Sequence, residues 1–459
     1  MTQTPPYQVT NPATGEVTKA FEFATDAEIE AALGAATEGF TQWRQRPVAE
    51  RAAVVRRVGE LFTERAADLA ALITTEMGKR PAAAVGEARF CDQIFTYYAD
   101  NGPGLITDKP VPGHDNARIE YRPVGPVLGV MPWNYPYYQV ARFAAPNLIV
   151  GNTVVLKHAE NCPTSALAIV AIMKDAGVPD GVYTNVFATH EQVAALIADP
   201  RLRGVSLTGS ERAGAVVAET AGRNLKKVVL ELGGSDPYII LDTPDVAEAA
   251  KTAWATRMEN VGQACNSNKR MIVMDSIYDD FVAALVQRAS AATPRQPGDD
   301  SPRSYSPMVS RKAAENLRAQ VQDAVSKGAT LHVGGTLGDD HGAYFAPAVL
   351  TGVTPGMRAY TEELFGPVAV VYKVASDEEA VQLANAVDFG LGGAVFSADT
   401  QRATRVAEQL EVGMANVNTP SADGADLPFG GTKRSGFGRE LGPLGIDEFV
   451  NKRLFYVEK

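Results

Sequence analysis

Short apolar runs alternate with amphipathic segments along the middle of the chain. Between residues 126 and 234 the apolar runs are PVLGVMP, NTVVLKH, VYTNVFA, RGVSLTG and KKVVLELGG. Segments with apolar residues three and four positions apart separate most of these runs, at 137–149, 163–176, 190–198 and 210–223. Alternation of this kind is typical of strand–helix–strand units. This part of the chain therefore predicts a parallel sheet covered by helices, an α/β fold.

A second block with the same alternation follows the first. Its apolar runs are PYIILD, RMIVM, FAPAVL, PVAVVYKV, GGAVFS and GMANVN. Helical periodicity lies between them at 245–260, 279–292, 376–388 and 399–411. A chain of 459 residues exceeds the size at which a single hydrophobic core stops growing. We therefore expect a second α/β domain.

The two ends of the chain predict other elements. Residues 26–73 and 82–100 are rich in Ala and have helical periodicity, whereas 101–130 is rich in Pro and Gly with strand-like pieces. The C-terminal DEFVNKRLFYVEK ends in a strand that is expected to pair with the isolated strand at 117–123. Two strands outside both sheets predict an arm that bridges subunits.

Composition narrows the classes of function. Hydrophobic residues make up 45% and charged residues 21% of the chain, as in soluble globular proteins. A net charge of -11 argues against a general nucleic-acid or anionic-membrane surface. The N-terminus lacks a signal-peptide pattern, and no apolar run reaches the roughly 18 to 20 residues of a membrane helix. Three cysteines fit a reducing compartment, so we expect a cytoplasmic protein.

One of the three cysteines stands in an unusual neighbourhood. Cys265, in NVGQACNSNKR, has polar flanks and a preceding glycine, whereas Cys91 lies in an amphipathic helix and Cys162 precedes Pro163 at a helix start. The five histidines form no HxxxH or HExxH pair and the cysteines no CxxC pair, which argues against a metal site. From its surroundings alone Cys265 is a candidate nucleophile, a redox sensor or a bystander.

Three polar motifs follow strands of the first block, at the strand ends where α/β proteins bind ligands. In LTGS, Ser210 precedes a helix whose N-terminus attracts anions, although an ordinary capped turn has the same pattern. In LKHAE, Lys157 and Glu160 suit a ribose diol or a solvated ion pair. In ELGGSDP, Glu231 is a candidate base or a structural carboxylate.

The segment PWNYPYYQVARF adds an amide and a cation at a strand-to-helix transition. Asn134 stands between prolines, so its amide is expected to face outward. Arg142 lies two steps of four residues further on, on roughly the same side of an apolar helix. A buried arginine needs an anion, either a protein carboxylate or the carboxylate of a substrate.

The order of the motifs is more specific than any one of them. PWNYP, LKHAE, LTGS, ELGGSDP, NVGQAC, EELFGPV and PFGGTKRSGFGRE follow one another over residues 132–440. In this order they resemble the aldehyde dehydrogenases over essentially the whole chain. The resemblance implies a Rossmann-type cofactor domain, an α/β catalytic domain and a β-strand oligomerisation arm in a homodimer or homotetramer. The corresponding residues are 1–104 with 124–233, 234–445, and 105–123 with 446–459.

The resemblance also implies roles for single residues. Cys265 would attack the aldehyde carbon, and the Asn134 amide and the Cys265 main-chain N–H would hold the oxyanion of the thiohemiacetal. Glu231 would activate the water that hydrolyses the thioester, which speaks against a variant that transfers the acyl group to CoA. Cofactor contacts are implied for Trp133, Lys157, Glu160, Thr208, Gly209, Ser210, Glu363 and Phe365.

The carboxylate at position 160 predicts the cofactor. Glu160 would accept hydrogen bonds from the ribose hydroxyls and repel a 2'-phosphate, so we expect a preference for NAD, with NADP possible.

Two segments, PWNYPYYQVARFAAP and GGTKRSGFGRELGPLGIDEF, most resemble the succinate-semialdehyde dehydrogenase branch of the family. This implies that Arg142 holds the substrate carboxylate, with help from a serine ahead of PFGG. That stretch is about two residues longer than usual here, so the matching residue is Ser421 when counted from one side and Asp423 when counted from the other. An aspartate would repel a carboxylate substrate.

Two other hypotheses remain open from the sequence. In the first the enzyme oxidises uncharged small aldehydes and Arg142 is structural. In the second the chain is a binding or structural protein without catalysis, which the joint presence of Cys265, Glu231 and Asn134 disfavours. Asn266, Ser267 and Asn268 follow Cys265, so no local disulfide switch is expected.

Overall fold

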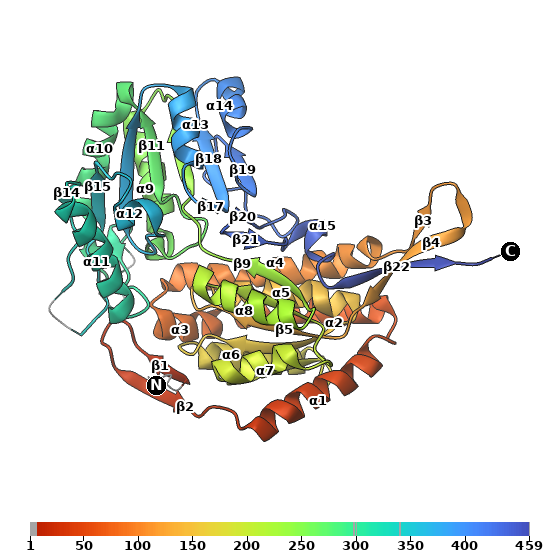
Figure 1. The fold of residues 1–459 in the computed structure, drawn as a ribbon. Helices are drawn as coiled ribbons and strands as arrows, with labels where there is room; N and C mark the ends of the chain where they lie inside the picture. Colours follow the sequence, from red (N-terminus) through yellow and green to blue (C-terminus); the bar gives the residue numbers. More distant parts are fainter. Residues whose placement is uncertain (1–6, 297–298, 300, 339–340, 459) are drawn as a thin grey trace.

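The computed structural model describes residues 7–296, 299, 301–338 and 341–458. It contains two helix-flanked sheets packed against each other and a narrow β arm that projects from one of them (Figure 1). This is the α/β fold that the two blocks of alternating runs predict.

The first sheet has the strand order β21-β9-β8-β5-β6-β7. Its strands are β5 (Pro126–Met131), β6 (Thr153–His158), β7 (Tyr183–Asn185), β8 (Gly204–Thr208), β9 (Lys227–Glu231) and β21 (Gly436–Phe437). The five strands from β5 to β9 are parallel and correspond to the predicted runs. Every residue of β6 and β8 is buried, because helices cover both faces. The edge strand β21 was not predicted, and it pairs antiparallel with β9, placing Gly436 opposite Glu231.

Eight helices belong to this half of the molecule. They are α1 (Asp26–Trp43), α2 (Val48–Glu64), α3 (Ala66–Met77), α4 (Pro81–Leu105), α5 (Tyr138–Val150), α6 (Pro163–Asp175), α7 (His190–Ala198) and α8 (Glu211–Arg223). The helical stretch predicted at 26–73 is interrupted at Pro47 and at Arg65. Helix α4 continues past the predicted end at residue 100, because Gly102 lets it lie close to α5. A Cβ at Gly102 would come within 2.6 Å of Ile149.

The second sheet has the order β14-β15-β16-β11-β10-β18-β19. Its strands are β10 (Pro237–Ile240), β11 (Arg270–Met274), β14 (Thr330–Val333), β15 (Ala348–Thr351), β16 (Val368–Val374), β18 (Gly392–Phe396) and β19 (Met414–Val417). Only β14 is antiparallel to its neighbour. The surrounding helices are α9 (Val246–Met258), η1 (Glu259–Gly262), α10 (Asp275–Ser290), α11 (Arg311–Ser326), α12 (Arg358–Thr361), α13 (Asp377–Asn385) and α14 (Thr400–Ala407).

Several elements were absent from the predicted pattern. Helix α11 and strand β14 belong to the second half, and an N-terminal hairpin of β1 (Tyr7–Thr10) and β2 (Val17–Phe21) packs beside α3 and α6. The other short elements are β12 (Thr293–Pro294), β13 (Ser304–Tyr305), β17 (Phe389–Gly390), β20 (Thr432–Lys433) and α15 (Gly442–Gly445).

The arm is a three-stranded antiparallel sheet of β3 (Lys109–Val111), β4 (His114–Pro123) and β22 (Val450–Tyr456) (Figure 1). Strand β22 pairs with β4 along its whole length, which confirms the predicted pairing of the C-terminal strand. Leu454 and Tyr456 on β22 are exposed. That the arm bridges subunits stays a prediction. In the described part of the chain, no helix combines the length and apolarity needed to cross a membrane.

Candidate active site

The turn that carries Cys265 consists of η1 and the residues that lead from it to β11, and it has an unusual backbone. Asn260 and Val261 adopt left-handed φ values of 45° and 56°, which β-branched residues such as valine rarely do. The buried guanidinium of Arg257 holds this turn against the segment before β16. It donates hydrogen bonds to the carbonyls of Gly262, Leu364, Gly366 and Val368 and to the Ser267 hydroxyl. Strained backbone held in place by such a network is typical of functional sites.

Asn134 is tied directly to this turn. Its side-chain amide donates to the carbonyl of Gln263 at 3.2 Å, and the Asn260 amide donates to the carbonyl of Asn134 at 2.9 Å. Gln263 is itself anchored, because its side-chain oxygen accepts from the N–H of Val309 at 2.9 Å. The structure thus brings together Asn134 and Cys265, which are separated in sequence by most of the first sheet.

Cys265 is half-buried and lines a cavity of about 330 Å³. Among the lining residues are the aromatic side chains of Phe90, Tyr135, Tyr138 and Phe429 and the charged side chains of Lys79, Glu87, Glu259 and Asp423. Ser421 lines the same cavity and donates to Asp423 at 2.8 Å, so both residues left open by the sequence face it. A cavity of this size suits a small substrate.

The thiol of Cys265 is protonated at neutral pH in this structure. Burial raises its pKa to about 12, although Arg142 and Lys269 act in the opposite direction. The Lys269 ammonium donates to the carbonyls of Ala264 and Cys265 at 2.8 and 2.7 Å. Lys269 also pairs with Glu363 at 3.0 Å. Formation of a thiolate at this site therefore needs a proton acceptor.

Glu231 stands at the end of β9, as its motif predicts, and is only 1% exposed. Neither of its carboxylate oxygens has a hydrogen-bond partner among the described residues. The backbone of Gly430 approaches closely, since a Cβ there would lie 2.7 Å from Oε1 of Glu231. Burial raises the pKa of Glu231 well above its usual range, Arg142 opposes this shift, and Glu440 adds to it.

Arg142 has a protein carboxylate as its partner. Its buried guanidinium forms an ion pair with Glu440 and makes hydrogen bonds to the Tyr138 hydroxyl at 3.4 Å and the Thr208 hydroxyl at 3.3 Å. The Phe429 ring lies against the guanidinium, with 4.5 Å between Cζ and the ring centroid. Arg142 is not among the residues that line the Cys265 cavity. Sequence reasoning did not single out Glu440, because no local pattern marks the partner of a distant arginine.

A second and larger cavity, of about 890 Å³, lies between the two halves of the molecule. Trp133 and Glu160 line one side of it, and Val309 to Lys312 at the start of α11 line another. Lys157 and Glu160 form an ion pair at the end of β6. Burial would raise the pKa of Glu160, but Lys157 lowers it below its usual value, so Glu160 is ionised. Cys162, at the N-cap of α6, is fully buried, and burial raises the pKa of its thiol.

The remaining residues implied in cofactor contacts lie at strand ends and in turns. Ser210 caps α8, since its hydroxyl accepts from the N–H of Ala213 at 3.3 Å, and Thr208 and Gly209 precede it at the end of β8. Phe365 packs edge-on against Trp133, with 5.7 Å between the ring centroids. Glu363 accepts from the N–H of Gly234 at 3.1 Å. Carboxylates for ribose hydroxyls and a helix N-terminus for phosphate form a suitable donor and acceptor set.

Comparison with known proteins identifies the family. The model of the aldehyde dehydrogenase family matches residues 1–454. The chain belongs to the aldehyde dehydrogenase family. The resemblance drawn from the order of the motifs is therefore confirmed, and the chain is an aldehyde dehydrogenase.

The names of similar aldehyde dehydrogenases mention different cofactors. A succinate-semialdehyde dehydrogenase [NADP(+)] of Deinococcus radiodurans is 54% identical over 450 residues, which are 98% of this chain and 94% of the relative. The crystal structure of succinic semialdehyde dehydrogenase from Streptococcus pyogenes in complex with NADP+ has a TM-score of 0.95 and 40% identity, covering 99% of this chain and 100% of that one. A Staphylococcus aureus betaine aldehyde dehydrogenase in complex with NAD+ has a TM-score of 0.93 and 31% identity, covering 98% and 90%.

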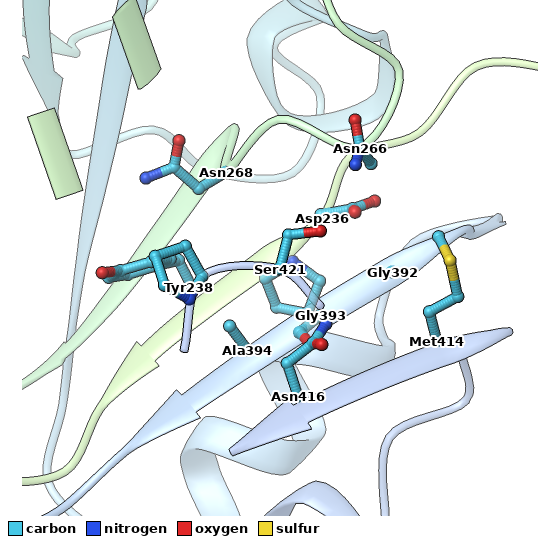
Figure 2. Close-up of a pocket in the computed structure, with 12 residues that line it drawn as sticks. Asp236, Tyr238, Asn266, Asn268, Gly392, Gly393, Ala394, Met414, Asn416 and Ser421 are labelled. Atoms are coloured by element: carbon cyan, nitrogen blue, oxygen red, sulfur yellow. The ribbon is translucent and has the colours of Figure 1, made fainter. Parts of the chain in front are cut away.

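A small polar cavity, of about 10 Å³, adjoins the Cys265 turn of this dehydrogenase (Figure 2). Asp236, immediately before β10, contributes a carboxylate, and Asn266 and Asn268 from the Cys265 turn lie above it with Ser421 beside it (Figure 2). Burial raises the pKa of Asp236 to about 7, with Lys269 acting in the opposite direction. Asp236 is a functional candidate that sequence reasoning missed, because only Glu231 was singled out from the motif ELGGSDP that contains both residues.

No group of three or more His, Cys, Asp or Glu side chains suited to a metal ion occurs within the described ranges. All three cysteines are free thiols, and Cys91 and Cys162 are buried.

Proposed function

We propose that this aldehyde dehydrogenase oxidises succinate semialdehyde, or a similar small carboxylated aldehyde, to the carboxylic acid. The observation that carries the proposal is the half-buried Cys265 on the wall of a small cavity, with the Asn134 amide tied to its turn. The names of the similar enzymes from Deinococcus radiodurans and Streptococcus pyogenes support the choice of substrate.

Cys265 begins the proposed mechanism. Its sulfur attacks the aldehyde carbon and forms a thiohemiacetal, and the thiol proton leaves to an acceptor. One N–H of the Asn134 amide is engaged by Gln263, and the other is available for the developing oxyanion together with the main-chain N–H of Cys265. A donor in such a position contributes roughly 3–4 kcal/mol to transition-state stabilisation.

The thiohemiacetal becomes a thioester on Cys265 by losing hydride from its carbon, and a bound nicotinamide dinucleotide would be the oxidant that accepts this hydride. The residues that would hold the dinucleotide are Trp133, Lys157, Glu160, Thr208, Gly209, Ser210, Glu363 and Phe365. Glu231 then takes a proton from water, whose oxygen attacks the Cys265 thioester and releases the acid and the thiol. The high pKa of Glu231 makes it a strong base once it has lost its own proton.

The negative charge of the substrate needs a cation, and Arg142 is the proposed anchor, with Ser421 as a hydrogen-bond donor. In this geometry the guanidinium lies beneath the cavity wall and is paired with Glu440. A substrate carboxylate would therefore have to compete with Glu440 for Arg142.

A second candidate function follows from the charged side chains that line the Cys265 cavity. Glu259 and Asp423 line the cavity and carry negative charge, which favours an uncharged aldehyde over a carboxylated one. The two candidates are separated by kcat/KM for succinate semialdehyde and for butanal at one pH and ionic strength. We expect the higher value with succinate semialdehyde. A higher value with butanal would establish the second candidate instead.

We further propose that NAD is preferred over NADP. Support comes from Glu160, which is ionised and faces the larger cavity, where it would repel a 2'-phosphate. Lys157 beside it offers that phosphate an attractive partner, so use of NADP is also expected. The names of two of the similar enzymes support NADP use.

The domain division is part of the proposal. We assign 1–104 with 124–233 to cofactor binding, 234–445 to catalysis, and 105–123 with 446–459 to subunit contacts. The exposed Leu454 and Tyr456 of the arm support a homodimer or homotetramer, because apolar side chains on a projecting strand are suited to burial by a partner.

A further inference from the structure

Arg142 pairs with Glu440 beneath the Cys265 cavity, and its positive charge also acts on Glu231. Arg142 comes from α5, Glu231 from the end of β9, and Glu440 from the segment after β21. All three are nearly inaccessible to solvent, at 1%, 1% and 4%. The cluster therefore holds one permanent positive charge and two groups that can each carry a negative charge.

The contacts of Arg142 orient it toward Glu440. The guanidinium forms its ion pair with Glu440, and the Ser206 hydroxyl donates to the other carboxylate oxygen of Glu440 at 3.2 Å. Arg142 also contacts the Thr208 hydroxyl, and Thr208 is the residue of β8 in register with Glu231 of β9. Residues in register on neighbouring strands point to the same face of a sheet. The guanidinium therefore lies on the face from which Glu231 projects.

Electrostatics then couples the two carboxyl groups. A buried carboxyl group ionises readily only beside an opposite charge, and two carboxylates at one site oppose each other's ionisation. Arg142 stabilises the ionised form of both groups, while Glu440 disfavours that of Glu231. The other charged or titratable groups that act on this pair are Arg439, Glu448 and Cys265.

We propose that Arg142 is a positioning residue for the hydrolytic step: through its ion pair with Glu440 it sets which of the two buried carboxyl groups carries the negative charge, and so when Glu231 can act as a base. This inference rests on the proposed function, in which Glu231 activates water. It differs from a role as substrate anchor, because it applies equally to a substrate without a carboxylate.

A substrate without a carboxylate separates the effect of Arg142 on hydrolysis from any effect on substrate binding. With 4-nitrophenyl acetate, the Cys265 sulfur attacks the ester carbonyl, 4-nitrophenol departs with the thiol proton, and an acetyl thioester remains. Water then cleaves the thioester to acetate and restores the thiol, with no cofactor and no charge for Arg142 to bind. A burst of 4-nitrophenol reports acylation, and the steady rate after the burst reports hydrolysis.

The test measures the pH dependence of that steady rate in the full-length protein. In Arg142→Met the acid limb, where the rate rises with pH, is expected to move up by about 1 pH unit or more, because the ionised form of Glu231 loses the stabilising charge of Arg142. In Glu440→Gln the acid limb is expected to move to lower pH. The competing carboxylate is then absent, and the positive charge of Arg142 stabilises the ionised form of Glu231 alone. Arg142→Lys keeps the charge and is expected to shift the limb less than Arg142→Met.

Arg201→Met serves as the matched control, since Arg201 pairs with Glu30 and Asp199 on the surface. Its acid limb is expected to coincide with that of the unmodified protein. Unchanged limbs in both Arg142→Met and Glu440→Gln, with the burst intact, would overturn the inference and leave the proposed function standing. If Arg142→Met does not fold, Glu440→Gln decides by itself. An acid limb that moves to higher pH or does not move in this variant would overturn the inference. No burst in the unmodified protein would instead contradict the proposed function on which the inference rests.

Discussion

The side-chain amide of Asn134 donates a hydrogen bond to the main-chain carbonyl of Gln263, at 3.2 Å and two residues before Cys265. The Asn260 amide bonds to the carbonyls of both Asn134 and Gln263, at 2.9 and 3.2 Å. The loop before α5 and the nucleophile turn are thus joined as one unit. This arrangement holds an amide donor close to the carbon that Cys265 would attack.

Asn134→Ala is expected to lower kcat by about 10²- to 10³-fold, because one of two oxyanion donors is lost. KM is expected to change much less, since the oxyanion exists only after attack on the aldehyde. Steady-state kinetics with NAD checks this. The alkylation rate of Cys265 by iodoacetamide is the control for an intact thiol. A drop of less than tenfold in kcat, with normal alkylation, would exclude Asn134 from the oxyanion site.

The buried thiol of Cys265 predicts a characteristic pH dependence of alkylation. Because burial raises its pKa to about 12, the thiolate fraction and the rate should rise about tenfold per pH unit from pH 7 to pH 10 in the cofactor-free protein. Cys91 and Cys162 are buried and should stay unlabelled. Mass spectrometry of the iodoacetamide adducts measures both, with Cys265→Ser as the blank. A plateau in the rate near pH 8 would contradict this prediction.

Glu231→Gln should separate oxidation from hydrolysis. The variant keeps the size of the side chain but cannot take a proton from water, so the thioester should accumulate. We expect a burst of NADH approaching one equivalent per active site, followed by a steady rate about 10² to 10⁴ times slower. Rapid-mixing absorbance at 340 nm, a wavelength at which NADH absorbs, records this. Equal steady rates in the variant and the unmodified protein would show that another group activates the water.

Glu160→Ser should change the choice of cofactor. Removing the carboxylate removes repulsion of a 2'-phosphate, while Lys157 remains to attract it. The ratio of kcat/KM for NADP to that for NAD should rise by about tenfold or more, equivalent to about 1.4 kcal/mol. Dissociation constants from quenching of intrinsic fluorescence should shift in the same direction without turnover. Glu191→Ser, an exposed carboxylate in the first turn of α7, is the control. A higher kcat/KM for NADP than for NAD in the unmodified enzyme would contradict the premise that Glu160 repels the 2'-phosphate.

Asp236 should make stability depend on pH. Its carboxyl has a pKa of about 7 in the folded protein and 3.8 as its ordinary value, because burial disfavours the charge. Between these values the folded state holds a proton that the unfolded state has lost, so stability falls as pH rises from about 4 to 7 and then levels off. The whole effect is on the order of 4 kcal/mol.

Asp236→Asn removes this titration while an amide oxygen can still accept from the N–H of Gly392. The Tm of the variant minus that of the unmodified protein should therefore increase between pH 5 and pH 8, as followed by differential scanning fluorimetry. A difference that stays constant over this range would show that Asp236 does not titrate there.

Local patterns were sufficient for most of the two sheets. Strands β5, β6 and β8 are buried on both faces and appear in the sequence as short apolar runs. Helix α11 was missed although its sequence carries a local signal, since its buried residues Ala314, Leu317, Gln320, Val321 and Ala324 recur at helical spacing. Where a helix end was misjudged, long-range packing decided. The end of α4 depends on its contact with α5 at Gly102.

The sequence by itself determined the family, the order of the motifs and the strand ends at which Lys157, Ser210 and Glu231 stand, because strand and cap signals are local. The tertiary structure alone decided the partner of Arg142 and the pKa of Cys265. An ion pair between α5 and the segment after β21 and the burial of a thiol both arise from contacts between distant parts of the chain. Burial in a low-dielectric interior changes the cost of charge, and no local pattern records how deeply a side chain will be buried.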